Sequence, residues 1–339
     1  MSWTPVAHVP DAVDGATDIA PMSERNSLLF EETYEGKRRT MARLCEGRVA
    51  IVTGAGRGVG REHALMLAAH GAKVVVNDLG AKVDGSGADA GPANEVVELI
   101  KKGGGEAVAN GDDVSSWNGA KNMIDQAIKT FGKLDVLVNN AGILRDRMLM
   151  NMTEQEWDDV IKVHLKGTFC PSRHAVEYWR NKNKETGKPV GGRIINTSST
   201  SGLFGNMGQT NYGAAKAGIA AFSIIAAREL RRIGVTVNAI SPSAVTRMTE
   251  GLRERTEEQK AQGDPKWIAP VITYLASEEA EDITARVFYI GNGVFSVMEG
   301  WHRGPQCDPI ADPVKLGPVL RKMASEARRN GGMDSKDLD

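Results

Sequence analysis

The stretch that decides the fold is GRVAIVTGAGRGVGREHAL, residues 47–65. It contains an apolar run, Val49–Thr53, and ends in a helical pattern that begins at Arg61. A continuous apolar run of this kind is typical of a strand buried on both faces of a parallel sheet. Glycines fill the turn between the strand and the helix, and such a turn lets the backbone approach a pyrophosphate group at a helix N-terminus. The stretch therefore predicts a nucleotide-binding turn after the first strand.

The same alternation of apolar runs and helix-length stretches continues to about residue 300. Seven such runs separated by helices predict a single α/β domain of the doubly wound Rossmann type, with a seven-stranded parallel sheet covered on both faces. Ligands of these folds bind at the carboxyl ends of the strands. The expected strands are Val49–Thr53, Lys73–Asn77, Glu106–Ala109, Leu134–Asn139, Arg193–Thr197, Val235–Ile240 and Arg286–Ile290, and the expected helices include Arg61–His70, Ala93–Lys102, Gly119–Phe131, Asp158–Arg180, Tyr212–Arg232, Ile268–Ala276 and Val319–Arg329.

The domain bounds follow from where this pattern begins and ends. Residues 1–45 lack a sustained period and are predicted to form a loosely ordered N-terminal extension. Residues 46–300 are predicted to form the Rossmann-type domain, and residues 301–339 a C-terminal tail. The alternative for the N-terminal extension is an arm that docks on a partner subunit through the apolar residues 28–30.

The composition excludes several classes of protein. With 41% hydrophobic and 25% charged residues and a net charge of −1, the chain is ordinary for a soluble globular protein and lacks the basic surface that nucleic acids or acidic lipids require. Its three cysteines lie far apart without metal-ligand spacing. We find neither a secretory signal nor an apolar run of the roughly 18 residues that a membrane span needs. These features predict a cytoplasmic protein without a metal site.

The glycine turn has the spacing T-G-x-x-x-G-x-G. A purely structural turn is the alternative, but the position after a strand and before a helix favours phosphate binding. The candidate cofactor residues of this turn are Thr53, Gly54, Gly56, Arg57, Gly58, Val59 and Gly60.

Asp78 ends the second strand, 20 residues past Gly58. A carboxylate there accepts hydrogen bonds from the adenosine ribose and repels a 2′-phosphate, which favours NAD over NADP. Arg57 has the opposite effect if its guanidinium pairs with a 2′-phosphate, and its alternative is a solvated surface residue. Asp78 decides for NAD, because an unpaired carboxylate against a phosphate is the costlier contact.

Two further strand ends fit the same cofactor. Asp113 and Val114, in GDDVSS after the third strand, are expected beside the adenine ring. Asn140, Ala141 and Gly142, in VNNAG after the fourth strand, are expected to let the nicotinamide half approach the backbone. Taken alone, each stretch is equally compatible with an ordinary strand-end turn.

A serine, a tyrosine and a lysine form the candidate catalytic group. Tyr212 and Lys216 lie four residues apart, on one face of a helix, and Ser199 follows the fifth strand. Hydride transfer between an alcohol and a nicotinamide needs an acid–base group for the proton on the oxygen. A phenol with a pKa of about 10 needs positive charge nearby to act near pH 7. We predict Tyr212 as the acid–base, Lys216 as its charged partner and ribose ligand, and Ser199 as the residue that holds the substrate oxygen.

These motifs in combination resemble the short-chain dehydrogenase/reductase family over roughly residues 46–300. VVNDLG, NNAGILRDRM, VHLKGTF and GNMGQTNYGAAKAG are similar to the (3R)-hydroxyacyl-CoA dehydrogenase domain of multifunctional β-oxidation enzymes and its free-standing bacterial relatives. The resemblance implies NAD-dependent oxidation of a 3-hydroxyacyl-CoA thioester, although some bacterial members act on steroid-derived substrates. It also implies cofactor contacts from Pro242 and Ser243, and a homodimer or homotetramer joined through the helices that contain Asp158–Arg180 and Tyr212–Arg232.

The chain departs from the wider family at His164 in VIKVHLKGTF. Most members have an asparagine there, which completes the catalytic group through a water relay to the lysine. A histidine also donates and accepts hydrogen bonds, so His164 is expected to serve the relay with an altered pH dependence. A helix histidine bound to a backbone carbonyl is the alternative.

The substrate is expected under residues 241–265, a polar segment after the sixth strand. Arg145 and Arg147 are candidates for CoA phosphates, and Phe204 and Met207 for an acyl pocket; solvated charges and simple packing are the alternatives. Two other functions stay open. One is an NAD(P)-dependent hydroxysteroid or polycyclic alcohol dehydrogenase or ketone reductase, and the other is a non-catalytic nucleotide-binding protein, which the presence of the candidate catalytic group disfavours.

Overall fold

The computed structural model describes residues 43–333 except 83, 88, 245–255 and 292. Nearly all of the predicted N-terminal extension and the middle of the predicted substrate cover lie outside the described residues. The described chain belongs to one compact unit that begins at Arg43. Every helix in these ranges is too short or too polar to cross a lipid bilayer.

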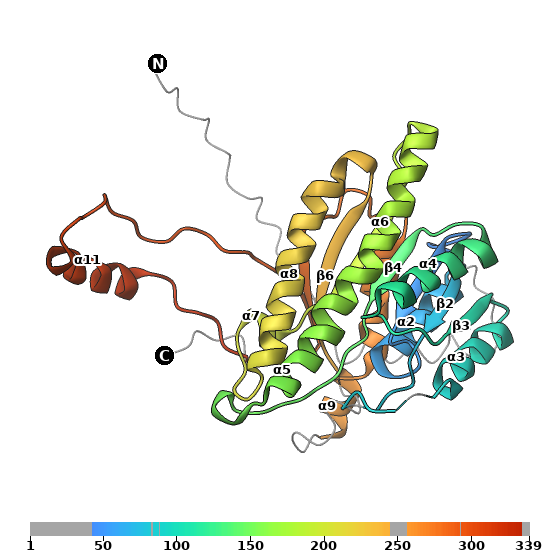
Figure 1. Cartoon of the computed structure of the whole chain (residues 1–339), viewed down its shortest axis with the longest axis horizontal. Helices are drawn as coiled ribbons and strands as arrows, with labels where there is room; N and C mark the ends of the chain where they lie inside the picture. The colour runs from blue at the N-terminus through green and yellow to red at the C-terminus, as the bar shows by residue number, and fades with distance from the viewer. Residues whose placement is uncertain (1–42, 83, 88, 245–255, 292, 334–339) are drawn as a thin grey trace, which may run out of the picture. The chain divides into compact units, whose positions relative to one another are not determined.

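The centre of the fold is one eight-stranded sheet with the order β3-β2-β1-β4-β5-β6-β7-β8 (Figure 1). Neighbouring strands from β3 to β7 pair in parallel, and β8 runs antiparallel to β7. The predicted doubly wound α/β fold is confirmed. The strands are β1 Val49–Thr53, β2 Lys73–Asn77, β3 Ala107–Asn110, β4 Val136–Asn139, β5 Arg193–Thr197, β6 Thr236–Ser243, β7 Val287–Gly291 and β8 Val294–Met298.

The predicted sheet of seven parallel strands is extended in the structure by an eighth strand, the antiparallel β8, which the prediction missed. This strand follows β7 after the tripeptide GNG, a hairpin signal that a search for buried apolar runs does not detect. Gly293 has a φ of +75°, the left-handed conformation that such a turn requires. Four of the five β8 residues are exposed, so the strand lies outside the buried parallel layer.

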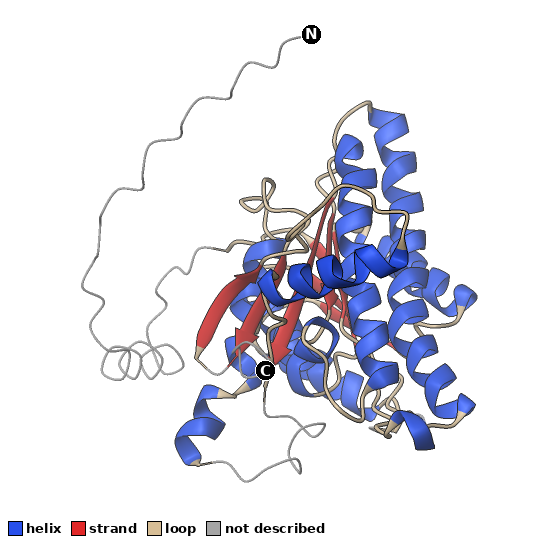
Figure 2. Cartoon of the chain, turned by 90° about the vertical axis from the view of Figure 1, so that its left-hand side faces the viewer, coloured by secondary structure: helices blue, strands red, loops and turns tan. Residues whose placement is uncertain are grey.

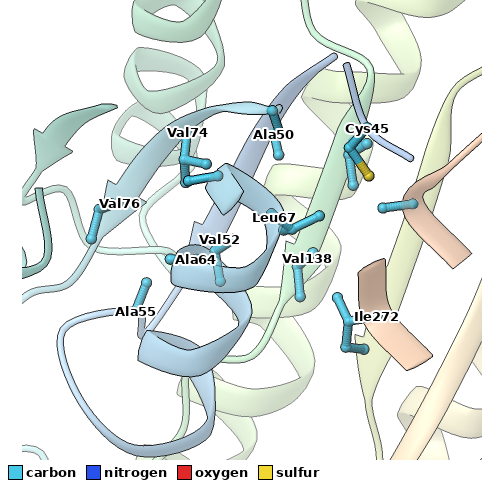
Figure 3. Close-up of a cluster of buried hydrophobic side chains, with 14 of the residues drawn as sticks. Cys45, Ala50, Val52, Ala55, Ala64, Leu67, Val74, Val76, Val138 and Ile272 are labelled. Carbon is cyan, nitrogen blue, oxygen red and sulfur yellow. The ribbon is translucent and has the colours of Figure 1, made fainter. Parts of the chain in front are cut away.

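Helices cover both faces of the sheet (Figure 2), and alternate residues of each central strand belong to opposite cores. Ala50 and Val52 of β1 belong to a core with residues of α2, α3 and α10, part of which Figure 3 shows, whereas Val49 and Ile51 belong to a core with residues of α4, α6 and α8. The helices are α2 Gly58–Ala69, α3 Gly91–Lys102, α4 Trp117–Phe131, α5 Glu154–Ile161, α6 Gly167–Thr186, α7 Thr200–Leu203, α8 Thr210–Leu230, α9 Glu257–Gln262, α10 Ala269–Ala276 and α11 Pro313–Glu326, with a π-helical turn at Lys162–Lys166 and 3₁₀ turns at Leu149–Asn151, Arg231–Ile233 and Pro265–Trp267.

Two predicted helices differ from the observed ones by more than three residues at an end or by an interruption, and the others differ by up to three residues at an end. The stretch Asp158–Arg180 is divided between α5, the π-helical turn and α6. The periodicity of apolar residues does not reveal such a π-helical turn within a helix. The helix predicted at Val319–Arg329 begins earlier, at Pro313, because the Asp312 carboxylate caps the helix by accepting from the backbone N–H groups of Val314 and Lys315.

The sheet order decides where the site lies. β1, β4, β5 and β6 are consecutive neighbours and parallel, so their carboxyl ends meet at one edge of the sheet. The loops that leave this edge carry the glycine turn, the NNAG stretch and Ser199, and β6 ends at the same edge with Ser243. The fold thus brings together segments that span nearly 200 residues of sequence.

Candidate active site

The glycine turn after β1 has the geometry of a phosphate cradle. Gly54 and Gly58 have φ values of +62° and +56°, which favour glycine. A Cβ atom on Gly60 would lie 2.2 Å from the carbonyl oxygen of Gly54, so the turn closes only with glycine there. The N-cap residue of α2, Arg57, is exposed and does not cap the helix with its side chain. The close turn and the uncapped N-terminus of a 12-residue helix fit a pyrophosphate group.

Asp78, just past β2, fixes this turn from the side. Its Oδ2 accepts from the backbone N–H of Gly56 at 2.7 Å, and its Oδ1 accepts from that of Gly80 at 2.7 Å. The carboxylate is therefore held beside the glycine turn, at the position where the predicted ribose contact would be made.

The NNAG stretch after β4 is tied to the same turn. The Asn140 amide donates to the carbonyl oxygens of Thr53 and Gly54, at 3.0 and 3.1 Å. The Thr53 hydroxyl accepts from the backbone N–H groups of Asn140 and Ala141. Asn140 thus links neighbouring strand ends, and Ala141 adds no bulk.

The other predicted cofactor residues lie at the carboxyl ends of their strands. Asp113 follows β3, and its carboxylate accepts from the N–H and the hydroxyl of Ser115. Val114 is buried next to Gly167. A Cβ atom added to Gly167 would lie 2.8 Å from the Cγ2 of Val114. Pro242 and Ser243 are the half-buried last residues of β6. Contact of these four residues with a cofactor stays a prediction.

Ser199, Tyr212 and Lys216 gather where β5 meets α8. Ser199 is the N-cap of α7, and its Oγ accepts from the N–H of Ser201 at 3.2 Å. Tyr212 lies in the first turn of α8 and Lys216 one turn later. The Lys216 Nζ donates to the carbonyl oxygen of Thr197 at 2.6 Å and lies 5.5 Å from the centroid of the Tyr212 ring. The candidate catalytic group is therefore assembled at the predicted edge.

Burial dominates the electrostatics of this group. It lowers the pKa of Lys216 to about 7. It also raises the pKa of Tyr212 to about 12, while a hydrogen bond with Ser199 lowers that pKa and the Asp146 carboxylate raises it. The lowered pKa that we expected for Tyr212 beside Lys216 is not observed, because burial has the largest effect on both residues and disfavours the charged form of each.

His164 lies in the π-helical turn with its ring edge toward Tyr212, at 5.1 Å between centroids. Its Nε2 is 2.8 Å from the carbonyl oxygen and 3.1 Å from the nitrogen of Ile143, and its buried Nδ1 has no hydrogen-bond partner among the described residues. Burial, followed by the charge of Lys216, lowers the pKa of His164 to about 3, against a raising effect of the Ile143 hydrogen bond. The observed contact, between His164 and the backbone of Ile143, matches the alternative of a histidine bound to a backbone carbonyl. A water relay from His164 to Lys216 stays a prediction.

Gly142 makes room for this histidine. A Cβ on Gly142 would lie 2.3 Å from the Cε1 of His164, so a side chain there would collide with the imidazole. The glycine of NNAG is thus explained here by close packing, and its predicted contact with the cofactor stays a prediction.

Sequence reasoning missed Asn211, which holds the first turn of α8. This fully buried side chain donates to the carbonyl oxygens of Arg145 and Glu156, both at 3.0 Å, and accepts from the N–H of Tyr212 at 2.7 Å. The only available signal was its place directly before the tyrosine. A pattern of apolar residues says nothing about such contacts, because they depend on two distant segments.

The residues expected to meet the substrate are arranged differently. Arg145 and Arg147 pair with carboxylates of α5, Asp159 at 3.4 Å and Glu156 at 3.2 Å, rather than projecting as free cations. Met207 is 89% exposed in the loop before α8, so it does not line an enclosed pocket in this structure.

Comparisons with known proteins agree with this geometry. The family model "short chain dehydrogenase" matches residues 48–260. The chain is 50% identical over 237 residues to the peroxisomal multifunctional enzyme type 2 of Drosophila melanogaster, which covers 70% of this chain and 38% of that enzyme. It is 43% identical over 302 residues to the hydroxyacyl-CoA dehydrogenase ChsB1 of Mycobacterium tuberculosis, and the aligned part covers 87% of this chain and 94% of that enzyme. A crystal structure of a short chain dehydrogenase from Mycobacterium avium is 50% identical with a TM-score of 0.77, over 85% of this chain and 98% of that one.

The chain belongs to the short-chain dehydrogenase family, and it is an oxidoreductase that acts on CH–OH groups. The family assignment made from the motifs is confirmed, including the likeness to hydroxyacyl-CoA dehydrogenases. Enzymes of this family use a nicotinamide cofactor, NAD or NADP, and the cradle at Gly54–Gly60 fits its pyrophosphate. The aligned part spans well under half of the Drosophila enzyme, which is a longer protein.

Two buried histidines, His63 and His164, are expected to make the fold acid-labile. Burial is the largest effect on each and lowers its pKa to about 3 in the folded protein, against 6.5 in an unfolded chain. Between these values the unfolded chain binds more protons, so the free energy of unfolding falls as the pH decreases from about 6.5 towards about 3. Each histidine contributes a slope of up to about 1.4 kcal/mol per pH unit.

Denaturant unfolding at pH 7 and pH 5 measures this slope. Replacement of His164 by asparagine is expected to make the pH dependence shallower. A variant with the same slope as the unchanged protein would contradict the assignment of acid lability to this side chain.

Proposed function

We propose that this protein is an NAD-dependent dehydrogenase that interconverts a 3-hydroxyacyl-CoA thioester and its 3-ketoacyl-CoA. The observation that carries the proposal is the assembly of Ser199, Tyr212 and Lys216 beside the glycine turn, at one edge of the sheet. The group can supply the acid–base chemistry of a CH–OH dehydrogenase, and a relative of which the chain covers 94% is named a hydroxyacyl-CoA dehydrogenase.

The side chains divide the work as follows. The Ser199 hydroxyl holds the substrate oxygen, and the Tyr212 phenol takes the alcohol proton in oxidation or returns it in reduction. Lys216 stands one helical turn away and holds positive charge near the phenol when it is protonated. The bound nicotinamide accepts or donates the hydride.

NAD is proposed over NADP because Asp78 is fixed beside the glycine turn. We expect the unchanged enzyme to prefer NAD. Replacement of Asp78 by asparagine removes the repulsion of a 2′-phosphate and is expected to narrow or reverse the preference, with exposed Arg57 available to the phosphate. The measurement is kcat/KM for both cofactors in both proteins. Equal values for NAD and NADP in the unchanged enzyme would defeat the argument.

A second candidate is oxidation of a hydroxysteroid or another polycyclic alcohol, as in some members of this branch. A different thioester carrier is a further possibility, since a 42% identical relative in Staphylococcus aureus is named a 3-oxoacyl-[acyl-carrier-protein] reductase. The test is kcat/KM on a panel of 3-hydroxyacyl-CoA esters and steroid alcohols. We expect the CoA esters to exceed the steroids by at least about tenfold, or roughly 1.4 kcal/mol in transition-state binding. A higher kcat/KM for the steroid alcohols than for the CoA esters would contradict the proposed function and support the second candidate.

The remaining sequence expectations belong to this proposal. They are the homodimer or homotetramer, the cytoplasmic location and the division into a domain at 46–300 with two extensions. The fly relative is named as peroxisomal, so location is to be settled by imaging of the tagged protein in its own cell.

A further inference from the structure

Gln209 lies where three segments of the site meet. It occupies the N-cap position of α8, three residues before Tyr212, and is 8% exposed. Its Oε1 accepts from the Ser201 hydroxyl at 2.7 Å and from the Asn206 amide at 2.9 Å. Its Nε2 donates to the Asp146 carboxylate at 2.8 Å. A carboxylate only accepts, so the amide end that faces Asp146 is the NH₂ group and the orientation of Gln209 is fixed.

Gln209 is connected to both catalytic segments, through its side chain to the segment of Ser199 and through its backbone to the turn of Tyr212. On one side, Ser201 donates its backbone N–H to the Oγ of Ser199 at 3.2 Å. On the other side, the carbonyl oxygen of Gln209 accepts from the N–H of Gly213 at 2.7 Å, within the helical turn that holds Tyr212. The loop after β4 is attached as well, because the backbone N–H of Arg147 donates to the carbonyl oxygen of Gly208 at 2.7 Å.

We propose that Gln209 is a positioning residue, which acts with Asp146 to fix the Ser199 hydroxyl relative to the Tyr212 phenol. This inference rests on the proposed function of that pair. The carboxylate and the amide touch neither reacting group, and they set the geometry in which proton transfer occurs. A displacement of about 1 Å in such a geometry is enough to reduce turnover by roughly 100-fold.

Charge gives the pair a second effect on the same reaction. Burial has the largest effect on the pKa of Tyr212, and the Asp146 carboxylate adds to the increase. The other titratable groups in contact with the Tyr212 ring are Lys216 on its own helix and His164 on the π-helical turn. On α5, which packs against α8, Glu156 is paired with Arg147. Removal of the Asp146 charge therefore lowers the pKa of Tyr212, and the low-pH limb of kcat/KM for alcohol oxidation moves to lower pH.

A double-mutant cycle tests the contact itself. Gln209→Glu keeps an acceptor for Ser201 and Asn206 but places a carboxylate against Asp146. Asp146→Asn keeps an acceptor for the Gln209 amide and removes the charge. The double variant reverses donor and acceptor across the same contact, because the amide introduced at position 146 donates to the carboxylate introduced at position 209. We expect kcat to fall roughly 10- to 100-fold in Gln209→Glu and to recover at least about tenfold in the double variant.

The controls separate positioning from general damage. NAD affinity is expected to stay within about twofold of the unchanged protein in all three variants, since the glycine turn is elsewhere. Gln155→Leu removes another glutamine–aspartate hydrogen bond, to Asp159 on the exposed side of α5, and is expected to leave kcat unchanged.

The proposal is overturned if Gln209→Glu retains about half of the kcat or more, or if the double variant is no more active than Gln209→Glu. If Gln209→Glu does not fold, recovery of folding and turnover in the double variant supports the proposal, and failure to recover contradicts it. Every variant is compared on whichever alcohol the unchanged enzyme oxidises, so the cycle stays informative if that alcohol is not a CoA thioester.

Discussion

Replacement of Tyr212 by phenylalanine is expected to reduce turnover by about 10²- to 10⁴-fold while NAD still binds. The phenol is the group that lies between Ser199 and Lys216, so its loss removes the acid–base and leaves the ring. The substitution leaves the hydrogen bond from the Tyr212 backbone N–H to the Asn211 side chain unchanged, and the ring contact with His164 remains. The fold and the glycine turn are therefore expected to be intact. Steady-state kcat and a fluorescence titration with NAD measure the two effects separately.

A matched control is Tyr274→Phe, which removes a phenol from a residue on α10 that is 40% exposed. This variant is expected to keep the activity of the unchanged enzyme. If Tyr212→Phe retained more than about a tenth of the turnover, the residue could not be assigned a general acid–base role of the usual size.

Replacement of Gly60 by alanine is expected to weaken the binding of NAD. The added Cβ would lie 2.2 Å from the backbone oxygen of Gly54 and 2.5 Å from the Asn140 amide nitrogen. Backbone atoms cannot rotate away as a side chain does, so the phosphate turn itself must move. Overpacking of this kind costs about 1–3 kcal/mol, which corresponds to roughly a 5- to 150-fold loss of NAD affinity if binding bears the cost.

The control for this change is Gly103→Ala, at the end of α3. Gly103 has a φ of −76°, and its added Cβ would meet nothing closer than 3.4 Å. We expect that variant to bind NAD as the unchanged protein does. An equal affinity in Gly60→Ala and Gly103→Ala, measured by calorimetric titration, would show that the turn after β1 is not the phosphate site.

Strands β1, β2 and β5 could be predicted well because each is an almost completely buried run. The bounds of β1, β2 and β5 coincide with the predicted ones. The position of the candidate catalytic group followed from one rule, that the carboxyl ends of neighbouring parallel strands meet at one edge. Ser199 and Tyr212 could be placed together in this way without any knowledge of their contacts.

What the sequence could not show depends on contacts between distant segments. The amides of Asn211 and Gln209 look like ordinary loop residues until Arg145, Glu156 and Asp146 are folded against them. Burial likewise reverses simple electrostatic reasoning. A tyrosine beside a lysine suggests a lowered phenol pKa, whereas desolvation of both residues raises that of Tyr212 and lowers that of Lys216.

We propose that at this site a hydride passes from C3 of a 3-hydroxyacyl-CoA thioester to NAD, while Tyr212 takes the proton of the 3-hydroxyl group. The most direct test follows NADH absorbance during oxidation of a 3-hydroxyacyl-CoA by the full-length protein and identifies the thioester product by mass spectrometry. We predict that NADH and 3-ketoacyl-CoA appear in equal amounts, and that Tyr212→Phe forms neither at a comparable rate. Failure of the unchanged protein to form NADH from any 3-hydroxyacyl-CoA, under conditions in which it oxidises another alcohol, would contradict the account.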